Sequence, residues 1–126
     1  MPYIETPDEI PIYYLDEGPR TSSGIFLIHA EPFSSSAWQR NIPELSRTFR
    51  VVAMDVRGRG QSGKTDDGHN LKQYGLDFRH VLEVLGLKRV VVVGWSLGGS
   101  IAWSYMQRFG DERLAGFVNV DQRPFR

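Results

Sequence analysis

The chain has 126 residues, 40% hydrophobic and 24% charged, which suits about one globular domain and excludes a disordered segment. Fifteen basic residues balance fifteen acidic ones, so no field of one sign favours nucleic acid or an anionic membrane as a partner. The absence of cysteine excludes disulfides, thiolate metal sites and a cysteine nucleophile. No secretory signal and no membrane-spanning run is visible, and we expect a cytoplasmic protein.

Short apolar runs bounded by turn residues predict the strands of a sheet. Most of these runs are apolar almost without interruption, which is typical of strands buried on both faces of a parallel sheet. The first run is weak and is expected at an antiparallel edge, and the last is weaker than the central ones. Strands are expected at residues 3–5, 10–15, 24–29, 51–54, 90–93 and 117–120.

Between the strands, apolar residues recur at spacings of three and four, which predicts helices at residues 35–48, 71–86 and 96–109. Gly86 and Gly110 follow the second and third helices as typical stop residues. Trp38 and Trp103 are expected to pack in the core. Alternating strands and helices indicate an α/β fold, here a doubly wound, mostly parallel sheet of about six strands with three main helices.

The segment 94–98 reads Gly-Trp-Ser-Leu-Gly and joins a buried strand directly to a helix. A serine flanked by glycines two residues away on each side fits a sharp, strained turn that lifts the hydroxyl above the sheet. In this position the amide of Leu97 begins the helix and points to where an oxyanion would form. The simpler alternative is that Ser96 is an ordinary helix N-cap.

With this motif the chain resembles the N-terminal half of the α/β-hydrolase superfamily. Residues 29–32 (His-Ala-Glu-Pro), followed by Trp38, are similar to the oxyanion loop of that family, and residues 55–62 (Asp-Val-Arg-Gly-Arg-Gly-Gln-Ser) to its next conserved loop. The resemblance covers nearly all of residues 10–125, and the layout is closest to the haloalkane dehalogenase, epoxide hydrolase and esterase branch. Ser96 stands where the dehalogenases and epoxide hydrolases carry aspartate, and serine favours acyl transfer.

The resemblance implies that Ser96 is the nucleophile and that the backbone amides of Leu97 and Glu31 form the oxyanion hole. Trp95 is expected to line a pocket for a small acyl substrate. Two departures from the family pattern weaken the expected oxyanion hole. Ala30 replaces a glycine at a turn that can need positive φ, and the Glu31 carboxylate adds negative charge unless it points away.

The family places its catalytic histidine after the serine, whereas His29, His69 and His80 all precede Ser96. His29 is a candidate general base because it ends the strand next to the serine, although loop scaffolding is the simpler interpretation. His69 is expected in a polar loop and His80 on a solvated helix face. Asp121 is a candidate triad acid at the end of the last strand, or simply a charged residue there.

Residues 1–126 are interpreted as one truncated domain that lacks the family's C-terminal strands, helices and cap. A sheet that ends at residues 117–120 leaves an unpaired edge and open apolar surface, which recruit another chain. A homodimer or higher oligomer is therefore expected, and it offers a histidine in trans.

Three functional hypotheses remain open. The first is a serine-type carboxylic ester hydrolase that acts on short acyl esters through Ser96. The second is a catalytically incomplete hydrolase fragment that serves as an assembly or binding module, and the third is one portion of a longer split enzyme. Scattered histidines and acids lack metal-ligand spacing, so neither a metal nor another cofactor is expected.

Overall fold

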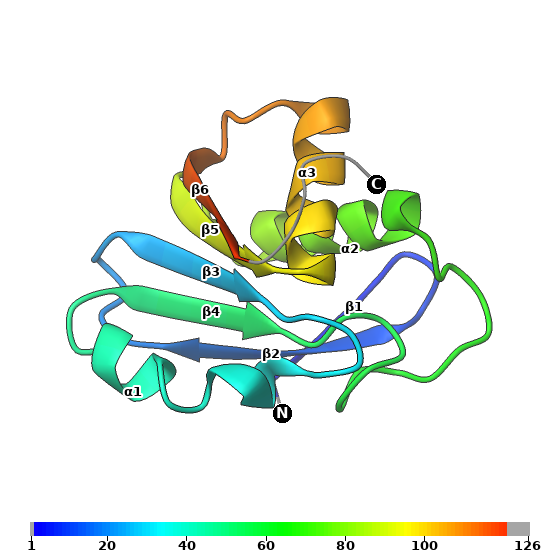
Figure 1. Ribbon diagram of the computed structural model, residues 1–126, viewed down its shortest axis with the longest axis horizontal. Coiled ribbons are helices and arrows are strands. Elements are labelled where there is room, and N and C mark those ends of the chain that lie inside the picture. The colour runs from blue at the N-terminus through cyan, green and yellow to red at the C-terminus, as the bar shows by residue number, and fades with distance from the viewer. Residues whose placement is uncertain (1, 121–126) are drawn as a thin grey trace.

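The apolar runs pair in parallel and form the centre of the sheet (Figure 1). The structure is a computed structural model that describes residues 2–120. The strands β3 (Gly24–Ile28), β4 (Arg50–Met54), β5 (Val90–Trp95) and β6 (Leu114–Val120) are parallel to one another. On the other side, β2 (Pro11–Glu17) pairs antiparallel with β4, and β1 (Tyr3–Glu5) antiparallel with β2. The order β1-β2-β4-β3-β5-β6 confirms the predicted fold class of a mostly parallel six-stranded sheet.

The last strand is longer than the sequence predicts, because β6 begins at Leu114 rather than at residue 117. Ala115 and Gly116 have low strand propensity, yet β5 supplies a full row of backbone partners that overrides it. The register shifts between Val90 and Val91, which is the irregularity that accommodates the early start.

The first predicted helix is broken into two short pieces, a 3-10 turn η1 (Ser35–Trp38) and a one-turn helix α1 (Ile42–Leu45). Pro43 stands at the beginning of α1, and proline disfavours helical backbone before it and donates no amide hydrogen. The other two helices, α2 (Leu71–Val84) and α3 (Leu97–Phe109), follow the predicted bounds closely.

Alternating residues of the strands face two separate hydrophobic clusters. Phe26 and Ile28 of β3 belong to the larger cluster, which α2 and α3 cover, and Leu27 belongs to the smaller one with Ile42 of α1. Figure 1 shows α1 on the opposite side of the sheet from α2 and α3. This separation confirms the two-sided burial that the continuous apolar runs predicted.

The smaller cluster covers only part of its face of the sheet. The helices η1 and α1 contact β3 and β4, whereas Val93 on the same face of β5 stays only partly buried. Beyond it, β6 is the edge strand, and its Val118 and Val120 are 47% and 38% exposed. The open edge expected from the sequence is therefore present among the described residues.

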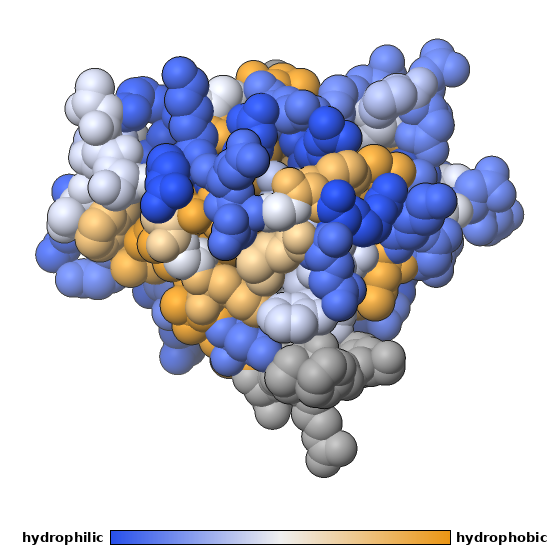
Figure 2. Space-filling model, turned by 90° about the horizontal axis from the view of Figure 1, so that it is seen from above, coloured by the Kyte–Doolittle hydropathy of each residue, from blue (hydrophilic) through white to orange (hydrophobic). Residues whose placement is uncertain are grey.

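The side of the molecule that carries α3 and β6 has an apolar area between hydrophilic residues, as Figure 2 shows from above. Trp103 of α3 is 36% exposed, so the prediction that it packs in the core is wrong. The apolar face of α3 is instead filled by Ile101, Ala102 and Tyr105, and Trp103 falls outside that stripe.

None of the described helices is both long and apolar enough to cross a membrane.

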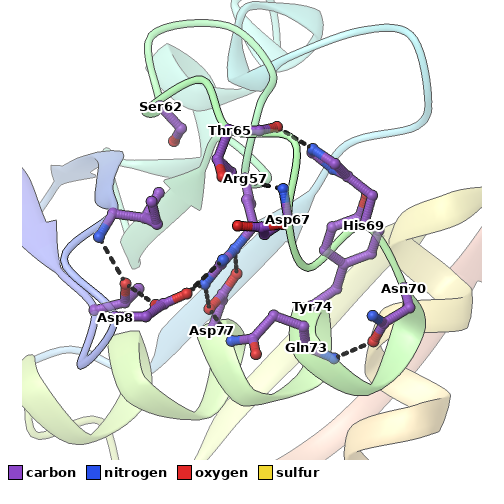
Figure 3. Close-up of polar contacts among 12 residues, drawn as sticks. Asp8, Arg57, Ser62, Thr65, Asp67, His69, Asn70, Gln73, Tyr74 and Asp77 are labelled. Carbon is purple, nitrogen blue, oxygen red and sulfur yellow. Dashed lines mark hydrogen bonds and ion pairs between the residues drawn. The ribbon is translucent and has the colours of Figure 1, made fainter.

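A buried arginine ties the loop after β4 to the rest of the fold (Figure 3). Arg57 has no exposed side-chain surface, and its Nε and Nη2 donate to the two carboxylate oxygens of Asp77, each at 2.9 Å. Its Nη1 and Nη2 also donate to Asp8, at 2.7 and 3.0 Å. Burial alone would lower the pKa of Arg57, but the hydrogen bonds that it donates to both carboxylates outweigh this effect and raise that pKa.

Asp55, the residue that follows β4, fixes the two loops at the carboxyl end of the sheet. Its Oδ1 accepts from the amide of Ser35 at 2.7 Å, and its Oδ2 from the amide of Gln61 at 2.8 Å. Asp55 and Arg57 are thus structural residues, and together they set where the loops near the site can lie.

Arg57 pairs with one buried carboxylate, Asp77, and one exposed carboxylate, Asp8, so loss of Arg57 and loss of Asp8 should lower the free energy of unfolding by different amounts. Replacing Arg57 with alanine leaves the 2% exposed Asp77 carboxylate without its cation and is expected to cost about 3–5 kcal/mol. Replacing Asp8, which is 50% exposed, should cost at most about 1 kcal/mol, because water screens that pair. Urea unfolding of both variants measures the difference, and equal losses would contradict this assignment.

Candidate active site

The backbone reverses sharply at Ser96, between the last residue of β5 and the first of α3. Ser96 has φ 53° and ψ −110°, in a region that non-glycine residues rarely adopt. Holding a residue there costs on the order of 1–3 kcal/mol, so the surrounding structure must enforce it. The predicted sharp turn is therefore present at the predicted residue.

The Ser96 side chain makes no capping hydrogen bond to the helix that follows it. The helix is instead joined to Ser96 through its carbonyl oxygen, which accepts from the amides of Gly99 and Ser100 at 2.9 and 3.2 Å. The alternative of an ordinary N-cap serine is thus excluded. The side chain is partly exposed, and its hydroxyl is not committed to the backbone of α3.

Two glycines make the turn sterically possible. A Cβ atom added at Gly98 would lie 2.1 Å from the carbonyl oxygen of Ile28, and one added at Gly94 would lie 2.6 Å from the amide nitrogen of Gly99. Neither backbone neighbour can move aside as a flexible side chain can. The two glycines therefore allow the start of α3 to press against β3 and β5, as the motif predicted.

The expected oxyanion donors lie on two different elements. Leu97 is the first residue of α3, where amides point out of the helix end with its partial positive charge. Glu31 lies in the loop after β3, the strand next to β5. Neither backbone amide forms a hydrogen bond with another residue in the described part of the chain, so both donors are open.

The two departures in this loop have local solutions. Ala30 is buried and does not adopt positive φ, so the replacement of glycine causes no backbone strain there. The Glu31 carboxylate forms an ion pair with the Arg59 guanidinium. Its negative charge is therefore partly neutralised beside the expected oxyanion site, and no pattern in the sequence had indicated this pairing.

His29 is completely buried and both of its ring nitrogens are in use. Its Nε2 accepts a hydrogen bond from the amide of Val56 at 2.9 Å, which leaves Nδ1 protonated and donating to the carbonyl oxygen of Ala30 at 2.8 Å. Burial lowers the pKa of His29 and keeps the ring neutral. This arrangement argues against His29 as the general base for Ser96 and makes it the anchor of the loop that carries Glu31.

The other two histidines also have partners away from Ser96. His69 contacts the Tyr74 hydroxyl through Nδ1 at 3.0 Å and the Thr65 carbonyl oxygen through Nε2 at 2.6 Å (Figure 3). His80 bonds the carbonyl oxygen of Glu5 through Nε2 at 3.0 Å. Asp121, the candidate triad acid, lies outside the described residues.

Trp95 lies in a small group of aromatic rings next to the turn. Its ring stacks on Phe33 with centroids 5.0 Å apart and meets the edge of Trp38 at 6.4 Å. Phe33 is 49% exposed, so one side of this group faces outward. Sequence reasoning named Trp95 but missed Phe33, which only tertiary contact brings to the site.

No group of three or more potential metal ligands occurs within residues 2–120.

The steric role of Gly98 predicts a selective loss on adding one methyl group. Gly98→Ala forces a Cβ against the Ile28 carbonyl oxygen and should lower stability by more than about 2 kcal/mol and abolish any Ser96-dependent activity. Gly75→Ala in α2 is the matched control, because its nearest contact would be an ordinary 3.6 Å. That control should be neutral or more stable by up to about 1 kcal/mol. Equal thermal midpoints for the two variants would contradict the close approach.

Comparison with known proteins finds enzymes of similar sequence. The bifunctional esterase/perhydrolase of Acinetobacter calcoaceticus is 38% identical over 125 residues, 98% of this chain and 45% of that protein. The non-heme chloroperoxidase of Burkholderia pyrrocinia is 35% identical over 127 residues, 98% of this chain and 46% of that protein. The chain therefore spans less than half the length of these relatives.

Solved structures give the same result in three dimensions. The bromoperoxidase of Bacillus anthracis superposes with a TM-score of 0.86 at 33% identity, over 90% of this chain and 41% of that one. A thermophilic esterase of Thermogutta terrifontis gives 0.85 at 31% identity, over 98% of this chain and 44% of that one. A family described as the alpha/beta hydrolase fold matches residues 25–125. This match covers most of the chain, and the chain therefore belongs to the α/β-hydrolase fold family.

Proposed function

We propose that this protein is a serine hydrolase that acts on short acyl esters, with Ser96 as its nucleophile. The observation that carries the proposal is the backbone of Ser96, held at φ 53° while its side chain leaves the helix uncapped. A strained residue whose hydroxyl does not cap the helix that follows it is typical of a catalytic position. The esterase and esterase/perhydrolase names of the relatives support the same class of chemistry.

In the proposed reaction the Ser96 Oγ attacks the ester carbonyl carbon and its proton passes to a general base. The carbonyl oxygen becomes an oxyanion, which accepts hydrogen bonds from the amides of Leu97 and Glu31. Collapse of this intermediate breaks the bond to the alcohol, which leaves with a proton, and water then releases the acid from the acylated serine. Trp95 and its stacked neighbour Phe33 would border the acyl group.

The general base is the part of the proposal that the described residues do not supply. His29 has both nitrogens committed, and His69 and His80 are bonded elsewhere. A base from a second copy of the chain, or from a further portion of a longer enzyme, completes the proposed site. Asp121 remains a proposed acid for such a histidine.

The commitment of all three histidines favours one alternative function. Without a base the serine hydroxyl stays protonated and reacts slowly at neutral pH. The chain would then act as a catalytically incomplete binding or assembly module, with the loop scaffold intact. Turnover separates this alternative from the hydrolase.

The hydrolase requires the Ser96 hydroxyl, whereas the binding module does not. Ser96→Ala should reduce hydrolysis of p-nitrophenyl acetate to the rate without enzyme, and should abolish labelling by a fluorophosphonate probe. Ser36→Ala, which changes an exposed serine hydrogen-bonded to Ser34, is the control and should keep both signals. Equal rates for the protein and its Ser96→Ala variant would favour the binding module.

The open edge of the sheet supports a proposed homodimer. β6 is the edge strand of the described sheet, and its exposed Val118 and Val120 offer a self-complementary surface across a two-fold axis. Light scattering after size-exclusion chromatography should give a mass of at least twice 14.4 kDa at micromolar concentration. Val118→Lys should shift the protein toward monomer, whereas Val84→Lys, which changes an even more exposed valine at the end of α2, should not. A stable 14.4 kDa monomer would refute the dimer.

A further inference from the structure

We propose that a pocket at the amino ends of β3, β4 and β5 binds the phosphate group of a small soluble anion. The pocket has a volume of about 220 Å³ and is bordered by the first residues of these strands, Gly24, Arg50 and Val90. These residues pair side by side in the sheet. Ser96 follows the opposite end of β5, about 20 Å away at about 3.3 Å per residue, so the pocket is separate from the proposed active site.

The pocket concentrates positive charge in a chain whose formal net charge is zero. Four cationic side chains border it, those of Arg20, Arg50, Lys88 and Arg89, together with Ser22 and Ser23. Asp16 pairs with both Arg20 and Arg50. Lys88 and Arg89 form no ion pair with any residue among those described, so the carboxylates nearby leave an excess of positive charge unmatched.

One of the cations is held in a fixed orientation. The Nε and Nη2 of Arg50 donate to the two oxygens of Asp16, at 3.0 and 2.7 Å, and both side chains are mostly buried. The hydrogen bond from Arg50 to Asp16 keeps the pKa of Arg50 above its ordinary value. No side-chain hydrogen bond of the Arg50 Nη1 group occurs within residues 2–120, and a guanidinium fixed in this way presents its remaining donors without further loss of side-chain entropy.

The loop that carries the unpaired cations is also anchored. Arg113 donates to the carbonyl oxygen of Leu87 at 3.0 Å, and the amide of Leu87 bonds the carbonyl oxygen of Leu82 at 2.9 Å. A Cβ atom at Gly86 would meet nothing within 4 Å, so the space beside the loop is open. Lys88 and Arg89 therefore extend from a fixed backbone next to free volume.

The helix α2 ends beside the pocket and works against an anion there. Its carboxyl end carries a partial charge of about −0.5 and is followed directly by the pocket residues Gly86 and Leu87. Two unpaired cations exceed this charge, and Ser22 and Ser23 add hydroxyl donors of the kind that a phosphate oxygen accepts. The balance therefore favours a compact anion of high charge.

Calorimetric titration with inorganic phosphate at constant ionic strength tests the proposal. The protein should give saturable heat with phosphate and with glycerol 3-phosphate. Lys88→Ala/Arg89→Ala should weaken both affinities by at least about tenfold, because the variant loses two charge-assisted contacts to the phosphate oxygens. Arg40→Ala/Lys72→Ala removes two other exposed cations and should leave binding unchanged.

Three outcomes would overturn the proposal. They are the absence of saturable heat with phosphate, equal weakening by the control pair, and binding only to vesicles that contain phosphatidate. Without saturable heat there is no phosphate site. Equal weakening by the control pair would mean that binding depends only on net positive charge, and binding to the vesicles alone would mean that the surface recognises a membrane. Circular dichroism of both double variants confirms that loss of binding is not loss of fold.

Discussion

The reversal of the chain at Ser96 depends on two close backbone contacts that only glycine permits. Gly98 rests against the Ile28 carbonyl oxygen and Gly94 against the amide of Gly99, so strand, turn and helix approach more closely than any Cβ atom allows. This packing holds Ser96 in its strained backbone and aims the first turn of α3 at the end of β3. The placement of the candidate nucleophile and of both candidate oxyanion donors follows from it.

Much of this arrangement was predictable from sequence because its causes are local or periodic. Continuous apolar runs gave the parallel strands, and the glycine spacing gave the turn at Ser96. The broken first helix was missed because the spacing of Trp38 and Ile42 mimics one helix, whereas Pro43 restarts it. The early start of β6 was missed because β5 supplies its partners, which is a tertiary effect.

In the candidate site, too, local features could be predicted from the sequence and tertiary contacts could not. Ser96 and Leu97 are adjacent in sequence, so their relation could be read directly. The pairing of Glu31 with Arg59 and the stacking of Phe33 on Trp95 join residues far apart in the chain, and no periodic signal announces them. His29 was a candidate base by position alone, and only the distances to Val56 and Ala30 reveal its structural role.

The buried imidazole of His29 also makes the loop after β3 sensitive to acid. Its Nε2 must remain unprotonated to accept the Val56 amide, and burial lowers the pKa of His29 below the ordinary value of 6.5. As pH falls below that value the unfolded chain takes up this proton first, so the folded state loses stability, and the loop anchor itself fails only at still lower pH. Part of any loss of activity at acid pH would thus report the integrity of this scaffold, apart from the ionisation of a catalytic base.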